Sequence, residues 1–508
     1  MPAQSIAPPF NQITKRQDLV VRELPADLET PVSVYLKLAG QGASFLLESV
    51  TGGEQLARYS FIGANLQQAY VLRQGRLEHH RNGQATDLPA RPGEGPLETL
   101  RRILEPAAIP AGLGLPRFTG GLVGYLGYDT SHYFEPNVPK MPGDTDPEAI
   151  FLLADTVVAF DHAYGKLALI AARQSASNGA RSGLSPEARL EAIERRLAQP
   201  LPASLHQQKA GAPGELQAHQ DKAHFLRAVG RAKEYITAGD IFQVVLSQRF
   251  SRQTTAGAFE IYRALRRLNP SPYMFFFDFG LLGGGQPLRL IGASPEVHVR
   301  LEGRRATLRP IAGTRRRGAT HGEDEALEAE LLADPKERAE HIMLVDLARN
   351  DLGRVCRYGS VHVPQLIQVE RYSHVMHLVS QVEGELRPDL DAFDLMRATF
   401  PAGTVSGAPK IRAMQIIAEL EAQARGPYAG AVGYFSYDGS MDTCITIRTL
   451  VMQGQQVNVQ AGAGIVADSD PEREYQETLQ KARALAEAIE MAETGSAHQS
   501  TRDTRRPI

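Results

Sequence analysis

Residues 431–463, AVGYFSYDGSMDTCITIRTLVMQGQQVNVQAGA, predict consecutive strands with no helix between them. Runs rich in Val, Ile, Tyr, Phe and Thr cover 431–438, 443–453 and 456–463, and such runs are typical of strands. Strands that follow one another directly favour an α+β fold, whereas a doubly wound parallel fold needs strict alternation of strand and helix. We therefore predict an α+β fold, a large sandwich of two mostly antiparallel sheets flanked by helices.

Helices and strands are mixed in the same way over the rest of the C-terminal half. Helices are predicted at 222–238, 256–269, 335–347, 391–399, 409–424 and 471–492, and strands at 241–250 and 361–384. In the N-terminal half, the apolar runs 44–50, 70–76 and 150–160 predict strands of a further sheet region. The stretch between the halves is rich in Ser, Gly, Ala, Gln and Pro and holds one predicted helix, 186–198, which is typical of a connector.

These changes in composition divide the chain into five segments. They are a flexible N-terminus (1–15), an N-terminal region (16–170), a connector (171–221), a C-terminal region (222–492) and a disordered tail (493–508). The first and last segments are Pro-rich or polar and lack the apolar residues that a packed core needs.

The overall composition excludes several classes of protein. The formal net charge is −3, so no global attraction to nucleic acid or membranes is expected. There is no signal-peptide pattern and no run of about 18 apolar residues, so neither secretion nor a membrane span is expected. Cys356 and Cys444 are too few for a disulfide framework, and we expect a cytoplasmic protein.

Two predicted helices begin alike, with an Asp-Pro pair at 334–335 and at 470–471. Asp is a good N-cap and Pro a good first helical residue. Each helix then carries two glutamates three residues apart on one face: Glu337 with Glu340, and Glu474 with Glu477. Acidic residues in a first turn also complement the helix dipole, so a purely structural interpretation stays open for either helix alone. The functional hypothesis is that both pairs converge on Mg²⁺, which prefers carboxylates, waters and substrate oxygens.

Small-residue loops and one arginine are further candidates for an anion site. The stretches 403–410 (GTVSGAPK) and 461–465 (AGAGI) let backbone N–H groups approach an anion, although neither has the order of a P-loop and both could be tight turns. Arg448 falls in a predicted strand, where it could clamp a carboxylate through two hydrogen bonds or lie at the surface.

Two other clusters carry titratable or charged groups. His374 and His377 point to opposite faces if their segment is a strand, so they do not form a two-histidine metal site. One of them could do acid–base work near neutral pH, and a hydrogen-bonded structural histidine is the competing interpretation. Residues 310–314 (PIAGT) are followed directly by three arginines, 315–317.

Together these motifs resemble a known family. In order they are LLES (46–49), NPSPYM (269–274), GASPE (292–296), PIAGT (310–314), EHIMLVDLARND (340–351), 371–380, 403–410 and 461–481. Their number and order resemble component I of anthranilate synthase, within the chorismate-utilising enzymes. The resemblance covers roughly residues 20–490 and is weakest across the connector. It implies that the N-terminal region is regulatory and that 222–492 binds chorismate.

The resemblance also implies roles for single residues. Mg²⁺ and the ring carboxylate of chorismate would be bound directly at Glu340 and Glu477, with Glu337 and Glu474 in support. Substrate-carboxylate contacts would come from Tyr428, Arg448, Gly462, Gly464 and Lys481, and the site would be lined by Thr314 and Thr404. Glu296 matches the acid that protonates the departing C4 hydroxyl, and His377 matches the histidine linked to pyruvate elimination.

Two positions discriminate among relatives. Members that add water carry a lysine base where this chain has Gln243, and a glutamine cannot activate water. Aminodeoxychorismate synthases of the usual type carry a candidate nucleophilic lysine where this chain has Ala312. With both lysines absent, direct attack of ammonia at C2 remains, giving anthranilate and pyruvate in the first step of tryptophan synthesis.

Ammonia has to come from a second protein or from solution. No Gly-x-Cys-x-Gly setting of a glutamine amidotransferase occurs in the sequence. We therefore expect a separate glutamine amidotransferase subunit and a hetero-oligomer such as a heterotetramer, with free ammonium as an alternative source.

The resemblance further implies inhibition by L-tryptophan. Glu48 and Ser49 match the feedback motif, and the other wall of the inhibitor site matches Pro272, Tyr273, Met274, Tyr434 and Cys444. Arg58 is a candidate for the basic contact, without support from a motif. A strand end with a capping serine is the structural alternative. The chain contains no tryptophan, which agrees with an enzyme that is made when tryptophan is scarce.

Two other hypotheses remain at this point. One is an aminodeoxychorismate or phenazine-pathway synthase, whose product keeps the enolpyruvyl group. The other is a catalytically silent amino-acid sensor, against which the full set of Glu296, Glu340, His377, Arg448 and Glu477 argues.

Overall fold

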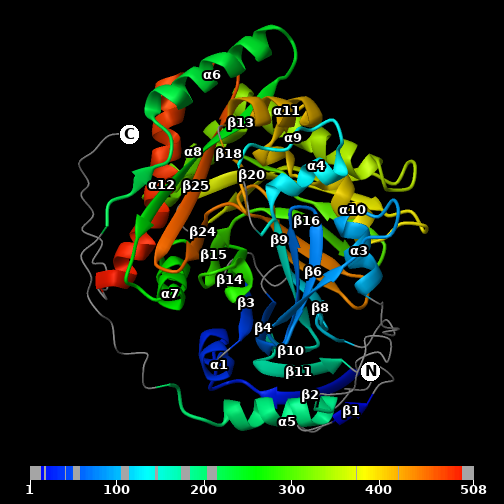
Figure 1. Cartoon of the computed structure of the whole chain (residues 1–508). Coiled ribbons are helices and arrows are strands. Elements are labelled where there is room, and N and C mark those ends of the chain that lie inside the picture. The colour runs from blue at the N-terminus through cyan, green and yellow to red at the C-terminus, as the bar shows by residue number, and fades with distance from the viewer. Residues whose placement is uncertain are drawn as a thin grey trace, which may run out of the picture.

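Two large antiparallel sheets form the framework of the chain (Figure 1). The computed structural model describes residues 13–15, 19–40, 42–49, 58–104, 114–143, 147–172, 184–202, 214–372, 375–421 and 423–494. Within these ranges one sheet has 13 strands and the other 12. The sheets pack face to face: Phe61 of the first meets Tyr434 of the second edge-on, with ring centroids 5.9 Å apart. The predicted α+β sandwich is confirmed.

Both sheets contain strands from both halves of the chain. The first sheet runs β1 (Ile13–Lys15), β2 (Leu19–Pro25), β11 (Lys166–Ala172), β10 (Thr156–Asp161), β4 (Tyr59–Leu66), β3 (Ala43–Glu48), β14 (Tyr273–Gly280), β15 (Leu288–Ser294), β24 (Thr449–Gln453), β25 (Gln456–Ile465), β13 (Gln243–Gln253) and β12 (Gln217–Ala218), with β21 (Gly407–Ala408) beside β13. The second runs β18 (Ile311–Arg316), β20 (Val375–Glu385), β17 (Arg305–Leu308), β16 (Val297–Glu302), β23 (Met441–Ile445), β22 (Ala431–Ser436), β8 (Gly121–Leu126), β9 (Ala149–Ala154), β5 (Gln68–Arg73), β6 (Arg76–Arg81) and β7 (Gln84–Leu88), with β19 (His362–Arg371) beside β20. The pairs β3–β14 and β8–β22 join the halves.

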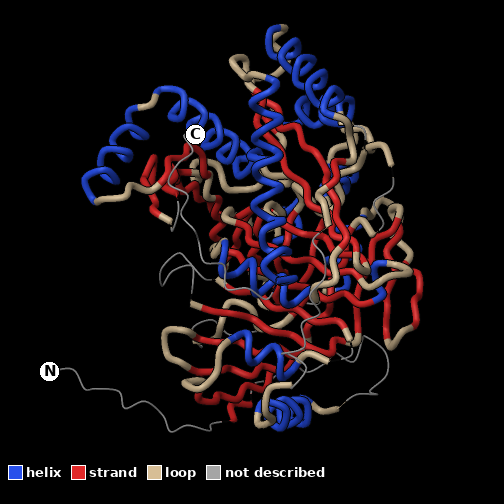
Figure 2. Tube along the Cα trace, turned by 90° about the vertical axis from the view of Figure 1, so that its left-hand side faces the viewer, coloured by secondary structure: helices blue, strands red, loops and turns tan. Residues whose placement is uncertain are grey.

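Helices cover the outside of the sandwich (Figure 2). They are α1 (Pro31–Leu38), α3 (Pro96–Ile103), α4 (Ser131–Phe134), α5 (Pro186–Leu197), α6 (Lys222–Thr237), α7 (Ala258–Leu268), α8 (His321–Ala333), α9 (Pro335–Gly353), α10 (Ala392–Thr399), α11 (Lys410–Leu420) and α12 (Pro471–Thr494), with short 3₁₀ turns at Tyr128–Thr130, Leu281–Gly283 and Gly403–Val405. None of the helices in the described ranges is long and apolar enough to cross a membrane.

The predicted segment boundaries are partly outside the described residues. Residues 1–12 and 495–508 are among those not described. Helix α12 runs on to Thr494, into the predicted tail, and its Glu493 forms a buried ion pair with Arg252 at 2.7 Å. The division into a regulatory and a chorismate-binding region stays a prediction.

Twice, a pair of antiparallel strands bends together from one sheet into the other. At the C-terminal bend, formed by residues 295–296 and 446–448, β15 and β24 pair in the first sheet and continue as β16 and β23, which pair in the second. At the N-terminal bend, formed by residues 67 and 155, β4 and β10 pair in the first sheet and adjoin β5 and β9, which pair in the second.

Two strand predictions are corrected at these bends. The predicted strand 150–160 is β9 and β10, and the predicted strand 443–453 is β23 and β24, so each belongs to two sheets. The apolar pattern runs on through each bend because the residues on both sides of it are largely buried. A pattern of buried residues reports burial and cannot report a change of sheet.

A buried ion pair holds the end of α11 to the first sheet. The Arg425 side chain, 1% exposed, donates to Glu421 at 2.5 and 2.8 Å and to the carbonyl oxygens of Val405 and Val245 at 2.8 and 2.7 Å. Glu421 also accepts from the backbone and hydroxyl of Ser247 in β13. These contacts satisfy both charges away from water.

Replacing Arg425 by Met should destabilise the protein by about 3–5 kcal/mol, because the buried Glu421 charge loses its partner. As a control, Arg412→Met removes the Arg412–Asp240 pair, in which both side chains are 36% exposed, and should change stability by at most about 1 kcal/mol. Urea unfolding of the two variants measures both values. Equal losses would mean that the buried pair contributes no more than an exposed one.

Candidate active site

Glu296 lies at the C-terminal bend, where the chain leaves β15 for β16. Its backbone oxygen accepts from Ile445 N at 3.0 Å, and its carboxylate is hydrogen-bonded by the Thr404 side chain. Burial raises the pKa of Glu296 to about 7, against the opposing effects of Thr404, Arg448 and Lys481. A carboxyl group with this pKa can hold a proton near neutral pH and give it up to a leaving group.

Arg448 stands on the other strand of the same bend. The predicted strand position is wrong, because Arg448 lies between β23 and β24 with φ at 49°, in the left-handed region. Its carbonyl oxygen accepts from Ala293 N at 3.1 Å, which joins the two strands across the bend. Arg448 forms no ion pair within the described ranges, so its guanidinium is open to a carboxylate ligand beside Glu296.

The two acidic helices converge. Asp334 caps α9 by accepting from Lys336 N at 2.9 Å and Glu337 N at 3.2 Å, and Asp470 accepts from Arg473 N at 2.9 Å at the start of α12. The pKa of Glu340 is raised by burial and by the charges of Glu337 and Glu477, while a hydrogen bond from Gln243 opposes the rise. The charge of Glu477 on α12 therefore affects the pKa of Glu340 on α9. The spacing of these residues in the sequence could not show this interaction.

A divalent cation fits this donor set in part. Oxygen donors suit Mg²⁺, and a cation would relieve the repulsion that raises the pKa of Glu340. Among the described residues, however, no three His, Cys, Asp or Glu side chains lie close enough to hold a metal by themselves. Mg²⁺ commonly binds through one or two carboxylates and takes its other oxygens from water and substrate. The glutamates fit such a shared site.

The predicted basic cluster is paired within the protein. Arg315 contacts Glu330, Asp334 and Glu337 at 2.8–3.0 Å, while Arg316 pairs with Glu323 and Arg317 with Asp324. These contacts tie β18 to α8 and α9. They also leave Glu337 engaged with Arg315, which agrees with a supporting position behind Glu340.

A narrow strip of β25 faces Tyr428, Gln243 and Lys481. Lys481 Nζ donates to the Gly462 carbonyl oxygen at 2.9 Å and pairs with Glu477 at 2.6 Å. A Cβ atom at Gly462 would lie 2.6 Å from the Tyr428 hydroxyl, and one at Gly464 would lie 2.5 Å from Gln243 Nε2. A side chain at either position would therefore displace Tyr428 or Gln243 from the strip.

His377 and Thr314 face one another across β20 and β18. His377 Nδ1 lies 3.1 Å from the Gly313 carbonyl oxygen and 3.0 Å from Thr314 Oγ1. Burial lowers the pKa of His377, against the Gly313 carbonyl, so the ring is neutral near pH 7. With Nδ1–H donated to Gly313, Nε2 is left as the acceptor. His374, the other predicted candidate, lies outside the described residues.

The predicted residues thus form one connected set. Hydrogen bonds or ion pairs link Glu296 to Thr404, and Lys481 to Glu477 and Gly462, while the charges of Arg448 and Lys481 lower the pKa of Glu296 and that of Glu477 raises the pKa of Glu340. His377 joins through its interaction with Arg448. Sequence reasoning missed Ser294, whose buried hydroxyl donates to the Ile445 carbonyl oxygen at 2.7 Å and braces the bend. Only its place in the GASPE motif pointed to it.

The predicted inhibitor residues line a cavity of about 60 Å³ between the two sheets. All seven belong to its wall: Glu48, Ser49, Pro272, Tyr273, Met274, Tyr434 and Cys444. Glu48 is 5% exposed and accepts from the Tyr262 hydroxyl and from Arg266 Nε at 3.1 Å. The sequence had therefore marked one contiguous pocket on strands far apart in the chain.

The basic contact in this cavity is not Arg58. Arg58 pairs with Asp161 at 3.0 Å and does not line the cavity. Arg117 and Arg300 do line it, and Arg300 is held by Asp442 at 2.9 Å. Neither arginine lies in one of the motifs that carry the family resemblance, so only the fold places them at this cavity.

The bend, the acidic helices and the glycine strip bring carboxyl groups, an arginine and a lysine from distant parts of the chain into one region. The chain belongs to the chorismate binding enzyme family, whose model matches residues 51–487. The family membership predicted from the motifs is confirmed.

Within this family, the chain is similar to several named proteins and solved structures. Anthranilate synthase component 1 from Acetivibrio thermocellus is 46% identical over 93% of this chain and 95% of that protein, and that from Thermus thermophilus is 48% identical over 92% and 97%. The crystal structure of anthranilate synthase component I from Streptococcus pneumoniae has a TM-score of 0.74 at 39% identity, covering 91% of this chain and 99% of that one. The menaquinone-specific isochorismate synthase from Escherichia coli shares the fold, with a TM-score of 0.66 at 22% identity over 94% of this chain and 96% of that one.

Replacing Glu296 by Gln should change how stability depends on pH. The pKa of Glu296 rises from 4.5 to about 7 on folding, so between these values the folded protein holds a proton that the unfolded chain has released. The free energy of unfolding therefore falls as pH rises through this window in the wild type. Urea unfolding from pH 4.5 to 7 should show a shallower fall for Glu296→Gln. Parallel curves would mean that the pKa of Glu296 is ordinary.

Proposed function

We propose that this protein converts chorismate and ammonia into anthranilate and pyruvate, as the first step of tryptophan synthesis. The observation that carries the proposal is Glu296, a carboxyl group with a pKa of about 7 placed beside an arginine that has no acidic partner within the described ranges. Membership of the chorismate binding enzymes and the names of the relatives support it.

The proposed reaction uses groups already placed at the site. Glu296 gives its proton to the C4 oxygen, which leaves as water while ammonia forms a bond to C2 and the ring double bonds shift toward C4. The C2 proton is then removed, the bond from C3 to the enolpyruvyl oxygen breaks, and pyruvate leaves an aromatic ring. The neutral His377, with Nε2 as acceptor, supports this elimination.

The acidic helices would hold the substrate carboxylate through Mg²⁺. Glu340 and Glu477 are the proposed direct ligands, with Glu337 and Glu474 behind them. Mg²⁺ would supply charge neutralisation between these carboxylates and the substrate. Arg448, Lys481 and the Tyr428 hydroxyl then orient the substrate by charge and hydrogen bonding.

Gln243 supports ammonia rather than water as the nucleophile. Its Nε2 donates to Glu340 Oε1 at 3.2 Å, which commits the side chain to the metal-binding carboxylate. An amide cannot take a proton from water, whereas ammonia attacks without a base. Ala312 lies on β18 within the bulge before Thr314 and offers no nucleophile, which argues against an aminodeoxychorismate synthase.

A separate glutamine amidotransferase subunit would supply the ammonia. Both cysteines are buried, and burial raises the pKa of each thiol, to about 11 for Cys356. Thiols of this kind are poor nucleophiles near neutral pH, so neither suits glutamine hydrolysis. The relatives' name, component 1, agrees with a second component and with a hetero-oligomer such as a heterotetramer. A cytoplasmic location fits this pathway.

L-Tryptophan would bind the cavity between the sheets, which at about 60 Å³ would have to widen around the ligand. Glu48 offers a carboxylate to the ammonium group, and Arg117 or Arg300 offers a guanidinium to the carboxylate. Strands of both sheets line this cavity, among them β14 and β23. A ligand there would contact strands connected to the proposed active site, because β14 pairs with β15 and β23 pairs with β16 next to the C-terminal bend.

Replacing Glu340 by Gln should reduce anthranilate formation at least about 100-fold. The loss of a direct metal ligand should reduce activity more than the loss of a residue that only supports a ligand. The assay follows anthranilate fluorescence with chorismate, Mg²⁺ and ammonium at alkaline pH, and calorimetry should show unchanged binding of L-tryptophan. Glu472→Gln, at an exposed glutamate in the first turn of α12 that pairs with Lys222, is the matched control and should keep full activity. Undiminished turnover in Glu340→Gln would contradict the metal assignment, and an aminated product that keeps its enolpyruvyl group would contradict the reaction.

Replacing Ser49 by Ala should raise the tryptophan concentration for half-inhibition by about three- to tenfold, the effect of one hydrogen bond, with kcat unchanged. Ser44→Ala is the control, because Ser44 lies on β3, which ends just before Ser49, but bonds to the Tyr35 hydroxyl outside the cavity. Equal sensitivity of both variants to tryptophan would remove Ser49 from the inhibitor site.

A further inference from the structure

A larger cavity lies at the N-terminal bend. Its volume is about 380 Å³, against about 60 Å³ for the inhibitor cavity. Small-molecule sites commonly span about 300–1,000 Å³, so this cavity is large enough for a ligand. Helix α5 from the connector forms one wall, and strands of both sheets that meet at the bend form the others.

This cavity and the proposed active site each lie at a bend where two paired strands pass between the sheets. Each bend is a pair of antiparallel strands that passes from the first sheet into the second. At the C-terminal bend, the residues between the strands include Glu296 and Arg448. At the N-terminal bend, the residues between the strands are Gln67 and Asp155, and both line the large cavity. Such a bend takes polar side chains out of the alternating pleat and turns them into the space beside it.

The charge on the cavity wall is positive. Arg81, Arg189 and Arg196 line it against a single carboxylate, Asp155, which pairs with Arg189 at 2.7 Å. Arg196 forms no ion pair in the described part of the chain, and its one hydrogen bond goes to the Ala39 carbonyl oxygen at 3.2 Å. Arg189 is engaged within the protein, because its Nη1 also donates to the Thr156 hydroxyl at 2.8 Å. The guanidinium of Arg196 suits an oxyanion.

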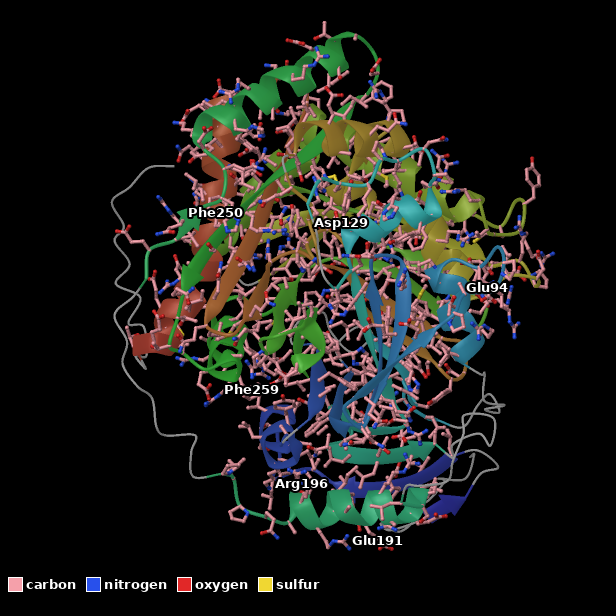
Figure 3. All side chains as sticks on the ribbon, viewed as in Figure 1. Glu94, Asp129, Glu191, Arg196, Phe250 and Phe259 are labelled. Atoms are coloured by element: carbon pink, nitrogen blue, oxygen red, sulfur yellow. The ribbon has the colours of Figure 1, made fainter. Side chains whose placement is uncertain are left out.

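The remaining wall is mostly apolar. Ile62, Leu153, Val158 and Ile193 contribute side chains from both sheets and from α5. A ligand that satisfies both parts of the wall has an apolar body and an anionic head. Figure 3 places Arg196 on the side of α5 toward α1, whereas Glu191 lies on the outer side of the helix.

We propose that this cavity is a second ligand site, which binds a small amphipathic anion: an aromatic or branched apolar body that carries a carboxylate or a phosphate. The apolar body lies on Ile62, Leu153 and Val158, and the anionic head meets the guanidinium of Arg196. The site is separate from the inhibitor cavity, although strand β4 serves both. Tyr59 and Phe61 line the inhibitor cavity, and Ile62 and Ala64 line this one.

The test uses the full chain and three probes with the same aromatic body: 2-naphthoate, 2-naphthyl phosphate and the neutral 2-naphthol. Calorimetry should show one anion bound per chain, with 2-naphthol binding at least tenfold more weakly. The tighter of the two anions identifies the head group as carboxylate or phosphate. No binding of either anion, or equally tight binding of 2-naphthol, would overturn the proposal.

Variants on α5 locate the bound probe. Arg196→Glu should weaken binding of the anions at least tenfold, and Arg195→Glu, at the exposed neighbouring arginine outside the cavity, should leave it unchanged. Because Arg196→Glu could loosen α5, Ala192→Trp provides a second variant that fills the cavity from the same helix. It should abolish binding while circular dichroism and Tm show a folded protein. Binding that survives in a folded Ala192→Trp, or that falls equally in both arginine variants, would place the probe elsewhere.

Discussion

The C-terminal bend is the constraint on which the site depends. Two paired strands leave one sheet and enter the other together, so the backbone groups at the bend lose their regular ladder partners and need others. The Ser294 hydroxyl and the cross-strand bonds from Ile445 N and Ala293 N supply them. Glu296 and Arg448 are therefore held on neighbouring strands of the same bend, where Glu296 is partly buried and Arg448 is exposed. Burial raises the pKa of Glu296, so this carboxyl group can hold a proton near neutral pH. The neighbouring Arg448, which forms no ion pair in the described ranges, could hold a carboxylate ligand beside it.

The acidic helices add charge repulsion to this bend. Their first turns are stable as helix starts, because Asp334 and Asp470 cap them. Their glutamates are nevertheless brought together, and the pKa values of Glu340 and Glu474 are raised mainly by burial, with neighbouring carboxylates adding to the rise. Lys481 on α12 and Arg315 on β18 offset part of the charge. A site arranged in this way is poised for a cation and an anionic substrate, which together remove the repulsion.

Much of this could be predicted from the sequence. Helix α9 and helix α12 begin at the predicted prolines, and the succession of strands without helices gave the correct fold class. The motifs also marked residues that line the cavity between the sheets. Three features could not be predicted. The segments 150–160 and 443–453 are each divided between two sheets, and Arg448 lies at a bend instead of in a strand. The cavity between the sheets is lined by Arg117 and Arg300, whereas Arg58 lies outside it. Periodicity records which side of a strand is buried, and burial on both sides of a bend hides the bend.

The sequence by itself determined the local structure and the chemical inventory: where helices begin, which runs form strands, which carboxylates and cations are available, and that lysine is absent at 243 and 312. Only the tertiary structure decided which of these groups meet. Glutamates on α9 and α12 are separated by more than a hundred residues, and their mutual charge effect arises from packing. The pKa of Glu296 near 7 is likewise a property of its surroundings, since a pKa shift of this size comes from burial and from neighbours distant in the chain.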